Sequence, residues 1–151
     1  METGTHIWDL QSEQRPTPMR TLHHGTISGE SASFLDWSPN DRVAASYRRA
    51  NIVRVYDVPN GRLQYEIAAP RNPTCVRFSP NGNRIAIVGY DSLVHLCDAS
   101  HGRRVLTLKG SNAHAGRTSI TARVLFSKDG SRIVTNDRQG RITVWEASRE
   151  R

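Results

Sequence analysis

The sequence has little of what several protein classes require. Two cysteines in 151 residues are too few for a disulfide framework. No run approaches the roughly 18 consecutive apolar residues of a membrane-spanning helix. The first 14 residues have neither the basic start nor the apolar centre of a secretory signal. These absences predict a cytoplasmic chain that does not enter a membrane.

Lysine is also scarce, although the chain is basic. Only Lys109 and Lys128 are lysines among 21 basic residues, and the formal net charge is +7. Such a charge raises nucleic acid as a partner, but the arginines are scattered and form no cluster longer than pairs such as Arg48-Arg49. A nucleic-acid site usually shows as a basic run or a one-sided stripe. The pattern therefore favours a solvated cationic surface and keeps nucleic acid as an alternative.

What the chain does have is internal repetition. The same opening occurs three times: Trp37-Ser38-Pro39-Asn40-Asp41, Phe78-Ser79-Pro80-Asn81-Gly82 and Phe126-Ser127-Lys128-Asp129-Gly130. A common closing occurs four times: Ile7-Trp8-Asp9, Val55-Tyr56-Asp57, Leu96-Cys97-Asp98 and Val144-Trp145-Glu146. From the serine to the residue before the acid there are 18 positions in each full copy (38 to 56, 79 to 97, 127 to 145). A repeat of forty-odd residues in phase indicates stacked structural units.

Each unit has the pattern of four antiparallel strands. Runs such as 52–58 and 93–97 have an apolar residue at every second position, which is typical of a half-buried strand. Turn residues of the Pro-Asn-Gly kind separate the runs. No stretch has helical periodicity long enough to compete, so the fold class predicted is all-β.

On these openings and closings the sequence resembles the WD-repeat family, from about residue 5 to residue 147. The resemblance implies four-stranded antiparallel blades arranged around a channel. It also implies structural roles for ten residues, namely Trp8, Trp37, Tyr56, Phe78, Asp91, Cys97, His114, Phe126, Thr135 and Trp145.

The sequence departs from the family in the hydrogen bonds that often tie each blade together. These join an indole, a Ser or Thr, a His and an Asp. In the last blade Trp145, Thr135 and His114 supply three, but Gln139 stands where the Asp belongs. The first full blade offers Ser46 with Tyr56 in place of the indole, and the middle blade keeps only Asp91. A lost hydrogen bond is worth about 1 kcal/mol, so we expect hydrophobic stacking to stabilise these blades.

The predicted division of the chain leaves the ring incomplete. Residues 1–24 hold the last two strands of a partial blade, 25–68 and 69–108 are full blades, and 109–151 form a blade without its outer strand. Propellers need about four to eight blades to close. We therefore expect a segment of a longer propeller, with a homodimer that completes the ring as the alternative.

The sequence shows no converging set of catalytic or metal-binding residues, and we expect neither an enzyme nor a cofactor. Adjacent His23 and His24 have no third ligand nearby at zinc spacing. Cys75 falls on a predicted inner strand, where a buried inert thiol is the expected state.

Partner binding is better supported. The resemblance implies docking on one face of the disc, made by the loops that enter each first strand and by the turns between second and third strands. Carried over by position, the candidates are Ser31, Ser33 and Arg49, then Asn72, Thr74 and Tyr90, then Ile120, Ala122 and Arg138. Arg and Tyr are enriched at interface hot spots. Neighbouring Arg48 and Arg42 would widen a cationic patch.

The function predicted is a non-catalytic scaffold for protein–protein contacts, with acidic peptides among its partners. One alternative is nucleic-acid or phosphopeptide binding through the arginine-rich face. Another is a sensor or interaction segment of a larger enzyme, such as a bacterial signalling kinase.

Overall fold

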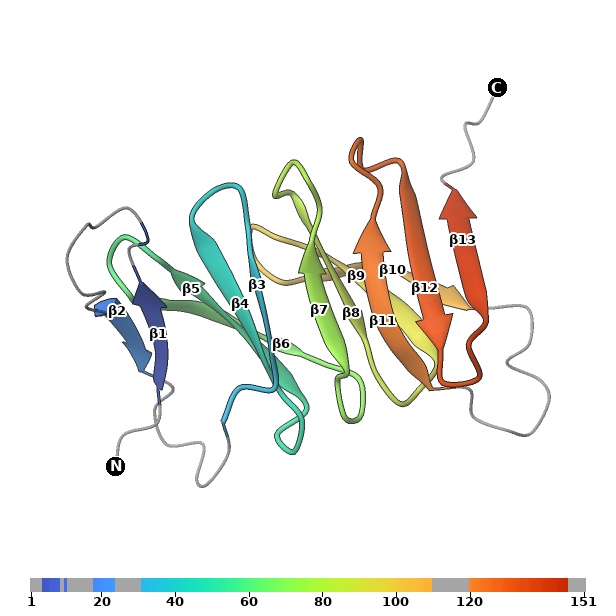
Figure 1. Cartoon of the computed structure of the whole chain (residues 1–151), viewed down its shortest axis with the longest axis horizontal. Coiled ribbons are helices and arrows are strands. Elements are labelled where there is room, and N and C mark those ends of the chain that lie inside the picture. Colours follow the sequence, from blue (N-terminus) through green and yellow to red (C-terminus); the bar gives the residue numbers. More distant parts are fainter. Residues whose placement is uncertain (1–3, 9, 11–17, 24–30, 110–119, 147–151) are drawn as a thin grey trace.

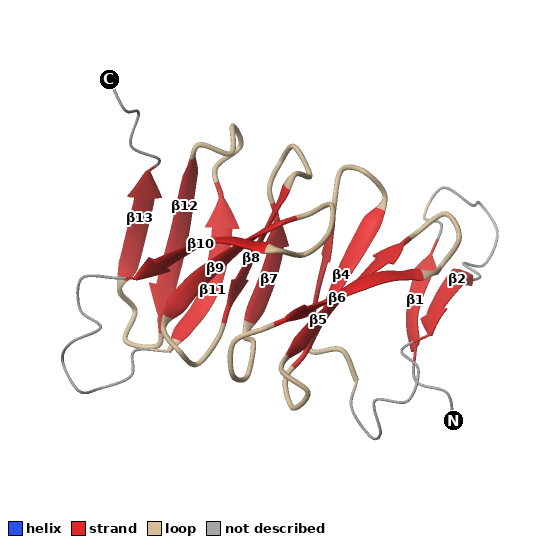
Figure 2. Cartoon of the chain, turned by 180° about the vertical axis from the view of Figure 1, so that it is seen from behind, coloured by secondary structure: helices blue, strands red, loops and turns tan. Residues whose placement is uncertain are grey.

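The computed structural model describes residues 4–8, 10, 18–23, 31–109 and 120–146. Within these ranges the chain forms strands joined by turns, and no helix (Figures 1 and 2). The strands make four antiparallel sheets that stand side by side along the molecule. The predicted all-β fold class is confirmed.

The sheets contain two, four, four and three of the described strands. The strand bounds are β1 (Gly4–Trp8), β2 (Pro18–His23), β3 (Phe34–Trp37), β4 (Arg42–Tyr47), β5 (Ile52–Asp57), β6 (Leu63–Ala68), β7 (Cys75–Phe78), β8 (Arg84–Val88), β9 (Leu93–Asp98), β10 (Arg104–Lys109), β11 (Thr121–Phe126), β12 (Arg132–Asp137) and β13 (Ile142–Glu146). Hydrogen bonds join them in the orders β1-β2, β3-β4-β5-β6, β7-β8-β9-β10 and β11-β12-β13. Each sheet is thus a meander of neighbouring strands, as in a propeller blade.

The repeated openings form the hairpins between first and second strands. The Ser79 hydroxyl accepts a hydrogen bond from the Arg84 backbone N–H at 2.9 Å, and Ser127 accepts one from Arg132 at the same distance. Gly82 closes its turn with φ 71°, a conformation that favours glycine. The repeated opening therefore forms a tight turn, which the serine side chain closes by its hydrogen bond to the start of the second strand.

Hydrophobic contacts between neighbouring sheets build the core. One cluster joins the two central sheets through residues such as Val55 and Ile85, and a second joins β1-β2 to the next sheet through Leu22 and Tyr47. A third cluster joins the middle sheet to β11-β12-β13. The first strands β3, β7 and β11 lie beside one another (Figures 1 and 2). The sheets thus pack face to face, as blades of an incomplete propeller do.

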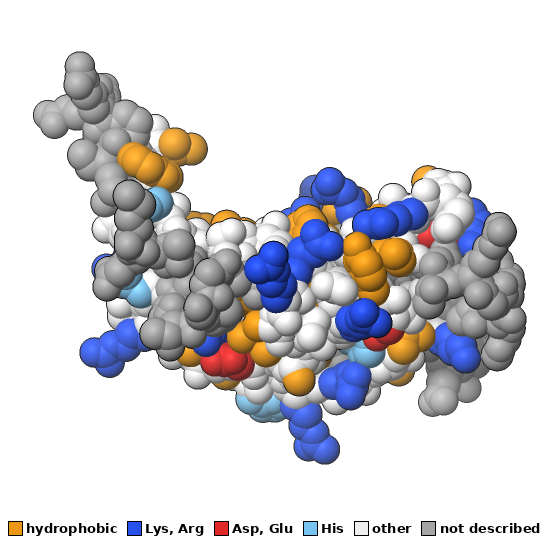
Figure 3. Space-filling view, turned by 90° about the horizontal axis from the view of Figure 1, so that it is seen from below, with side chains coloured by type: hydrophobic (Ala, Val, Ile, Leu, Met, Phe, Trp, Pro, Cys, Tyr) orange, Lys and Arg blue, Asp and Glu red, His pale blue; other side chains and the backbone are white. Residues whose placement is uncertain are grey.

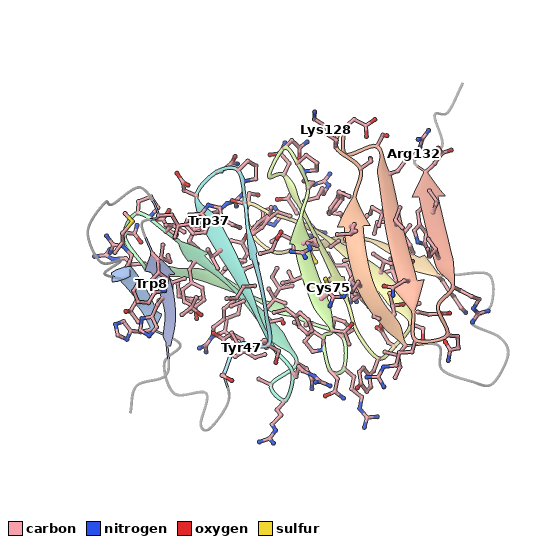
Figure 4. The ribbon with its side chains drawn as sticks, in the orientation of Figure 1. Trp8, Trp37, Tyr47, Cys75, Lys128 and Arg132 are labelled. Carbon is pink, nitrogen blue, oxygen red and sulfur yellow. The ribbon has the colours of Figure 1, made fainter. Side chains whose placement is uncertain are left out.

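The residues expected to be structural differ in burial. Tyr56, Phe78 and Cys97 are buried, and Asp91, Phe126, Thr135 and Trp145 lie in or beside the packed sheets. Trp8 and Trp37 are instead about half exposed, at 48% and 50%, and line an open groove between β1 and β3 (Figure 4). Both indole rings stay half exposed because no further described strand packs over them. His114 lies outside the described residues.

The blade-tying hydrogen bonds form only in part. The Trp145 indole Nε1 donates to Thr135 Oγ1 at 3.2 Å. In the first full blade, by contrast, the Ser46 hydroxyl is buried without a hydrogen-bond partner among the described residues. The Tyr56 hydroxyl lies 3.3 Å from that of Tyr47. In the first full blade Tyr47, and not Ser46, therefore lies beside the Tyr56 hydroxyl.

Candidate functional site

One end of the sheets carries most of the predicted partner-binding residues. It consists of the β4–β5, β8–β9 and β12–β13 turns together with the segments that enter β3, β7 and β11, and we call it the turn face. Backbone hydrogen bonds join the two kinds of segment: Tyr90 N–H to the Arg71 carbonyl at 2.9 Å, and Arg138 N–H to the Ile120 carbonyl at 3.3 Å. The turn face is the lower end of the molecule in Figure 4, where Tyr47 precedes the first of these turns; Lys128 lies at the opposite, upper end. The turn face is thus a surface that crosses three sheets and is held together by backbone hydrogen bonds.

Tyr90 stands at the centre of a cluster on the turn face. Its hydroxyl accepts a hydrogen bond from Arg48 Nη2 at 3.1 Å and another from Arg138 Nη2 at 3.0 Å. The two guanidinium carbons lie 5.8 Å and 5.3 Å from the ring centroid. Cation–π contacts of this kind contribute about 0.5–1 kcal/mol at exposed sites. The cluster joins one residue from each of three consecutive sheets.

The electrostatics of this cluster differ from those of the arginines that are paired with carboxylates elsewhere in the described part of the chain. Five arginines there, Arg54, Arg77, Arg84, Arg132 and Arg141, each form an ion pair with a carboxylate. Neither Arg48 nor Arg138 has a carboxylate within 4.0 Å among the described residues, and both are exposed. Figure 3 views this end and shows Lys and Arg side chains gathered over its middle, with few acidic ones. The turn face therefore presents uncompensated positive charge.

The other predicted contact residues fall on the same end, with one correction. Ser31 and Ser33 are exposed, and Asn72, Ile120 and Ala122 are half-buried. Thr74 is buried and is not available to a partner: its hydroxyl donates to the Thr121 carbonyl at 2.6 Å and so joins β7 to the neighbouring sheet.

The arginine that contacts Tyr90 is the neighbour of the one predicted from the sequence as a contact residue. Arg49 is exposed on the turn face, but Arg48 makes the contact. Arg42 does not extend this patch, since it opens β4 at the opposite end. There its guanidinium donates to the Ala99 carbonyl and, at 2.7 Å, to the Gly82 carbonyl. The prediction that Arg42 widens the patch is wrong, because Arg42 begins the six-residue strand β4 and Arg48 follows its other end.

The middle sheet also contains a chain of polar side chains that the repeat pattern did not predict. Asp91 Oδ2 lies 2.6 Å from His95 Nε2, and Arg104 Nη1 lies 3.0 Å from His95 Nδ1. His95 is buried at 6% exposure. A His four residues after an Asp across a tight turn is a signal in the sequence that could have identified this contact. These bonds hold the β8–β9 turn, and with it Tyr90, against the sheet.

The thiols and histidines do not form a reactive centre in the described part of the chain. Cys75 and Cys97 are both buried and unpaired by a disulfide. Burial raises the pKa of the Cys97 thiol to about 11, which keeps it protonated near neutral pH. No group of three or more His, Cys, Asp or Glu side chains with metal-binding geometry occurs among the described residues. His24 lies outside them. The same ranges contain no helix long and apolar enough to cross a membrane.

Comparison with known proteins agrees with this geometry. Residues 61–98 match the family "WD domain, G-beta repeat". The chain is 31% identical over 99 residues to WD repeat-containing protein 1 of Xenopus tropicalis, a match covering 65% of the chain and 16% of that protein. It is 32% identical over 104 residues to the Angio-associated migratory cell protein of Homo sapiens, covering 68% of the chain and 23% of that protein. The matched region thus spans less than a quarter of either relative.

The family match coincides with structural repeats. Residues 61–98 run from the turn before β6 to the end of β9, and therefore include the Phe78-Ser79-Pro80-Asn81-Gly82 opening and the Leu96-Cys97-Asp98 closing. The same opening and closing frame the neighbouring sheets, which have the same strand order. The chain belongs to the WD-repeat family.

Proposed function

We propose that this chain is a non-catalytic scaffold that binds protein partners through its turn face. Membership of the WD-repeat family supports a protein-interaction role in general. The observation that carries the choice of face is the Arg48–Tyr90–Arg138 cluster, whose two arginines are exposed beside a half-buried tyrosine and which three sheets support. Tyr and Arg of this kind combine flat contact area with strong donors, which suits them to interface hot spots.

The chemistry of the turn face favours acidic partners. The chain carries a net charge of +7, and the two arginines of the cluster have no carboxylate neighbour among the described residues. A partner segment with negative charge would supply the missing anion, and complementary charge would also speed the encounter. The cytoplasmic location expected from the sequence belongs to the same proposal, and the two thiols without a disulfide support it.

A second copy of the chain is a further proposed partner, at a different place. Leu125, Ile142 and Val144 on the last sheet are 54%, 72% and 58% exposed. Among the described strands none pairs with the outer edge of β13, and an apolar sheet face beside such an edge invites pairing. Light scattering after size exclusion tests this contact: a mass of twice 16.9 kDa supports it, and a monomer contradicts it.

Site-specific photo-cross-linking tests the choice of face. A benzoylphenylalanine placed at Asn72 or Ile120 lies on the turn face, whereas one at Arg103 lies on the β9–β10 turn at the opposite end. We expect the first two positions to cross-link the same partner proteins in cell extract and the third to cross-link none of them. Equal labelling from both ends, or no labelling from the turn face, would contradict the proposed face.

A further inference from the structure

Two cations in the turn face share a single neutral acceptor. Arg48 and Arg138 each place one Nη2 within 3.1 Å of the Tyr90 hydroxyl oxygen. A phenol oxygen has two acceptor lone pairs, so both are used and its own hydrogen points elsewhere. Each guanidinium carries five N–H donors, of which one is used here. The cluster therefore keeps a surplus of donors and offers no vacant acceptor.

This arrangement is electrostatically incomplete. Two unit positive charges held close together repel each other, and no carboxylate offsets either of them among the described residues. Stacking on one aromatic ring keeps both guanidinium groups beside Tyr90 in spite of this repulsion. An anion bound between them would remove the repulsion and use the spare donors.

The surrounding backbone holds Tyr90 in place before any ligand binds. Tyr90 N–H donates to the Arg71 carbonyl at 2.9 Å. At the preceding Gly89, an added Cβ would lie 2.8 Å from that same carbonyl oxygen. The close approach of the two segments therefore requires glycine, and it fixes the turn that presents the ring. A site arranged in advance loses less entropy on binding.

We propose that Arg48, Tyr90 and Arg138 bind the phosphate group of a phosphorylated side chain in a partner peptide. This inference rests on the proposed function and names the chemistry that the turn face recognises. The two guanidinium groups donate to separate phosphate oxygens, and the Tyr90 hydroxyl donates to the third. Arginine matches phosphate in this way because its planar fork can give two parallel hydrogen bonds.

Charge and geometry favour a phosphate monoester over other anions. A phosphorylated side chain carries about −1.5 to −2 charge at neutral pH and three terminal oxygens, which matches two cations and one hydroxyl donor. A carboxylate carries one charge and two oxygens. A nucleic-acid backbone offers one charge per phosphate and binds through many spaced contacts, whereas this cluster is a single compact point.

Library retention provides the test. The immobilised full chain is offered a degenerate peptide library with a central phosphoserine, phosphothreonine or phosphotyrosine, and separately the unphosphorylated and glutamate-centred versions. Retained phosphopeptides are sequenced, and one is titrated by fluorescence polarisation. Orthophosphate and a single-stranded DNA oligonucleotide serve as further probes.

We expect retention of phosphopeptides only. Arg48→Ala and Arg138→Ala should each weaken the titrated peptide about tenfold or more, the size of a lost charge-assisted hydrogen bond. The double variant should abolish retention. Tyr90→Phe keeps the ring and removes the hydroxyl, and should give a smaller loss. Arg48→Lys keeps the charge without the fork and should rescue only part of the affinity.

The matched control is Arg62→Ala with Arg103→Ala. Both residues are exposed on turns at the opposite end. This variant therefore loses as many positive charges as the double variant of the cluster, while the cluster itself stays intact. It should bind the phosphopeptide like the parent chain. Circular dichroism melting verifies that every variant is folded.

Several results would overturn the inference. Retention of the glutamate library or of the oligonucleotide at equal strength would point to a general acidic or nucleic-acid site. Orthophosphate binding as tightly as the peptide would point to a free-phosphate site. Unchanged affinity in the double variant, or no retention at all, would remove the cluster as a phosphate site. Partner cross-links from Asn72 and Ile120 would persist if only the phosphate chemistry were wrong, so the two proposals fail separately.

Discussion

The middle sheet, β7–β10, and the last sheet, β11–β13, have the same sequence pattern and very different surroundings. Val94 and Ile142 each stand 15 residues after the serine of their repeat (79 to 94, 127 to 142). Val94 is 1% exposed and Ile142 is 72% exposed. The difference arises because β9 is covered by residues of the neighbouring sheets, whereas no described residue covers that side of β13.

This contrast shows that a blade's alternating pattern specifies its strands, while its neighbours decide its burial. Strand β8 is buried at four of its five positions, and β12, its counterpart, is buried at two of six. Hydrophobic stabilisation scales with the apolar area removed from water. The middle sheet should therefore hold most of the folding free energy, and the last sheet should be the weaker unit.

The largest difference in the free energy of unfolding should appear when one isoleucine in each of the two sheets is replaced by alanine. Ile85→Ala removes a fully buried side chain from β8 and should lower the free energy of unfolding by about 2–5 kcal/mol. Ile142→Ala acts on an exposed residue and should change it by less than about 0.5 kcal/mol. Urea denaturation measures both. Similar losses from the two variants would mean that β13 is covered in solution.

The seams on the two sides of the middle sheet should differ by a smaller amount. Asp36 of β3 accepts hydrogen bonds from Arg77 Nη1 at 2.7 Å and from the Phe78 N–H at 2.6 Å. Asp36→Ala should cost about 2 kcal/mol, since it leaves a buried N–H and a half-buried cation without their partner. Thr74→Val removes one neutral hydrogen bond from the other seam and should cost about 1 kcal/mol. Thermal melting of both variants would rank the seams, and the reverse order would contradict this account.

A third prediction concerns the hydrogen bond within the last sheet. Thr135→Val keeps the shape of the side chain and removes the acceptor of the Trp145 indole at 3.2 Å. We expect a loss of about 1 kcal/mol in the free energy of unfolding, followed through tryptophan fluorescence. Trp145→Phe in the same background should then cost no further hydrogen-bond energy. A full additional loss in the double variant would show that the two side chains act independently.

The smallest effect on stability should come from the cluster that joins the sheets on the turn face. Arg48→Ala and Arg138→Ala each remove an exposed cation–π contact and one hydrogen bond, and each should cost less than about 1 kcal/mol. Their effect on phosphopeptide binding should be far larger. A loss above about 2 kcal/mol in either variant would identify the cluster as a structural support and would contradict its role in binding.

Much of the architecture was predictable from the residues because turns and alternation act locally. The matched 18-residue spacing located the β7–β9 and β11–β13 hairpins, and the period-two patterns located strands such as β5 and β9. The end of the sheets that carries Tyr90 and Arg138 followed from their place in the turns. Each of these inferences depends on residues close together in the chain.

The inferences that needed neighbours in space were less successful. Thr74 was expected at the surface, but a carbonyl from the next sheet lies within reach of its hydroxyl and holds it inside. Arg48 and Arg49 are adjacent in sequence, and only the path of the β4–β5 turn decides which of them reaches Tyr90, 42 residues away. The His95 contacts with Asp91 and Arg104 likewise depend on how the β8–β9 turn folds and where β10 pairs.

The sequence by itself determined the all-β class, the repeat and the order of strands in each sheet, whereas the end of the molecule where a partner is proposed to dock came from the resemblance to the WD-repeat family. The sequence could do so because hairpins and strand alternation are set by neighbouring residues. Only the tertiary structure decided which apolar strands are covered, which arginines meet carboxylates and which two converge on Tyr90. Those outcomes depend on side chains brought together from different sheets, and their contact energies have no trace in the local pattern of any one repeat.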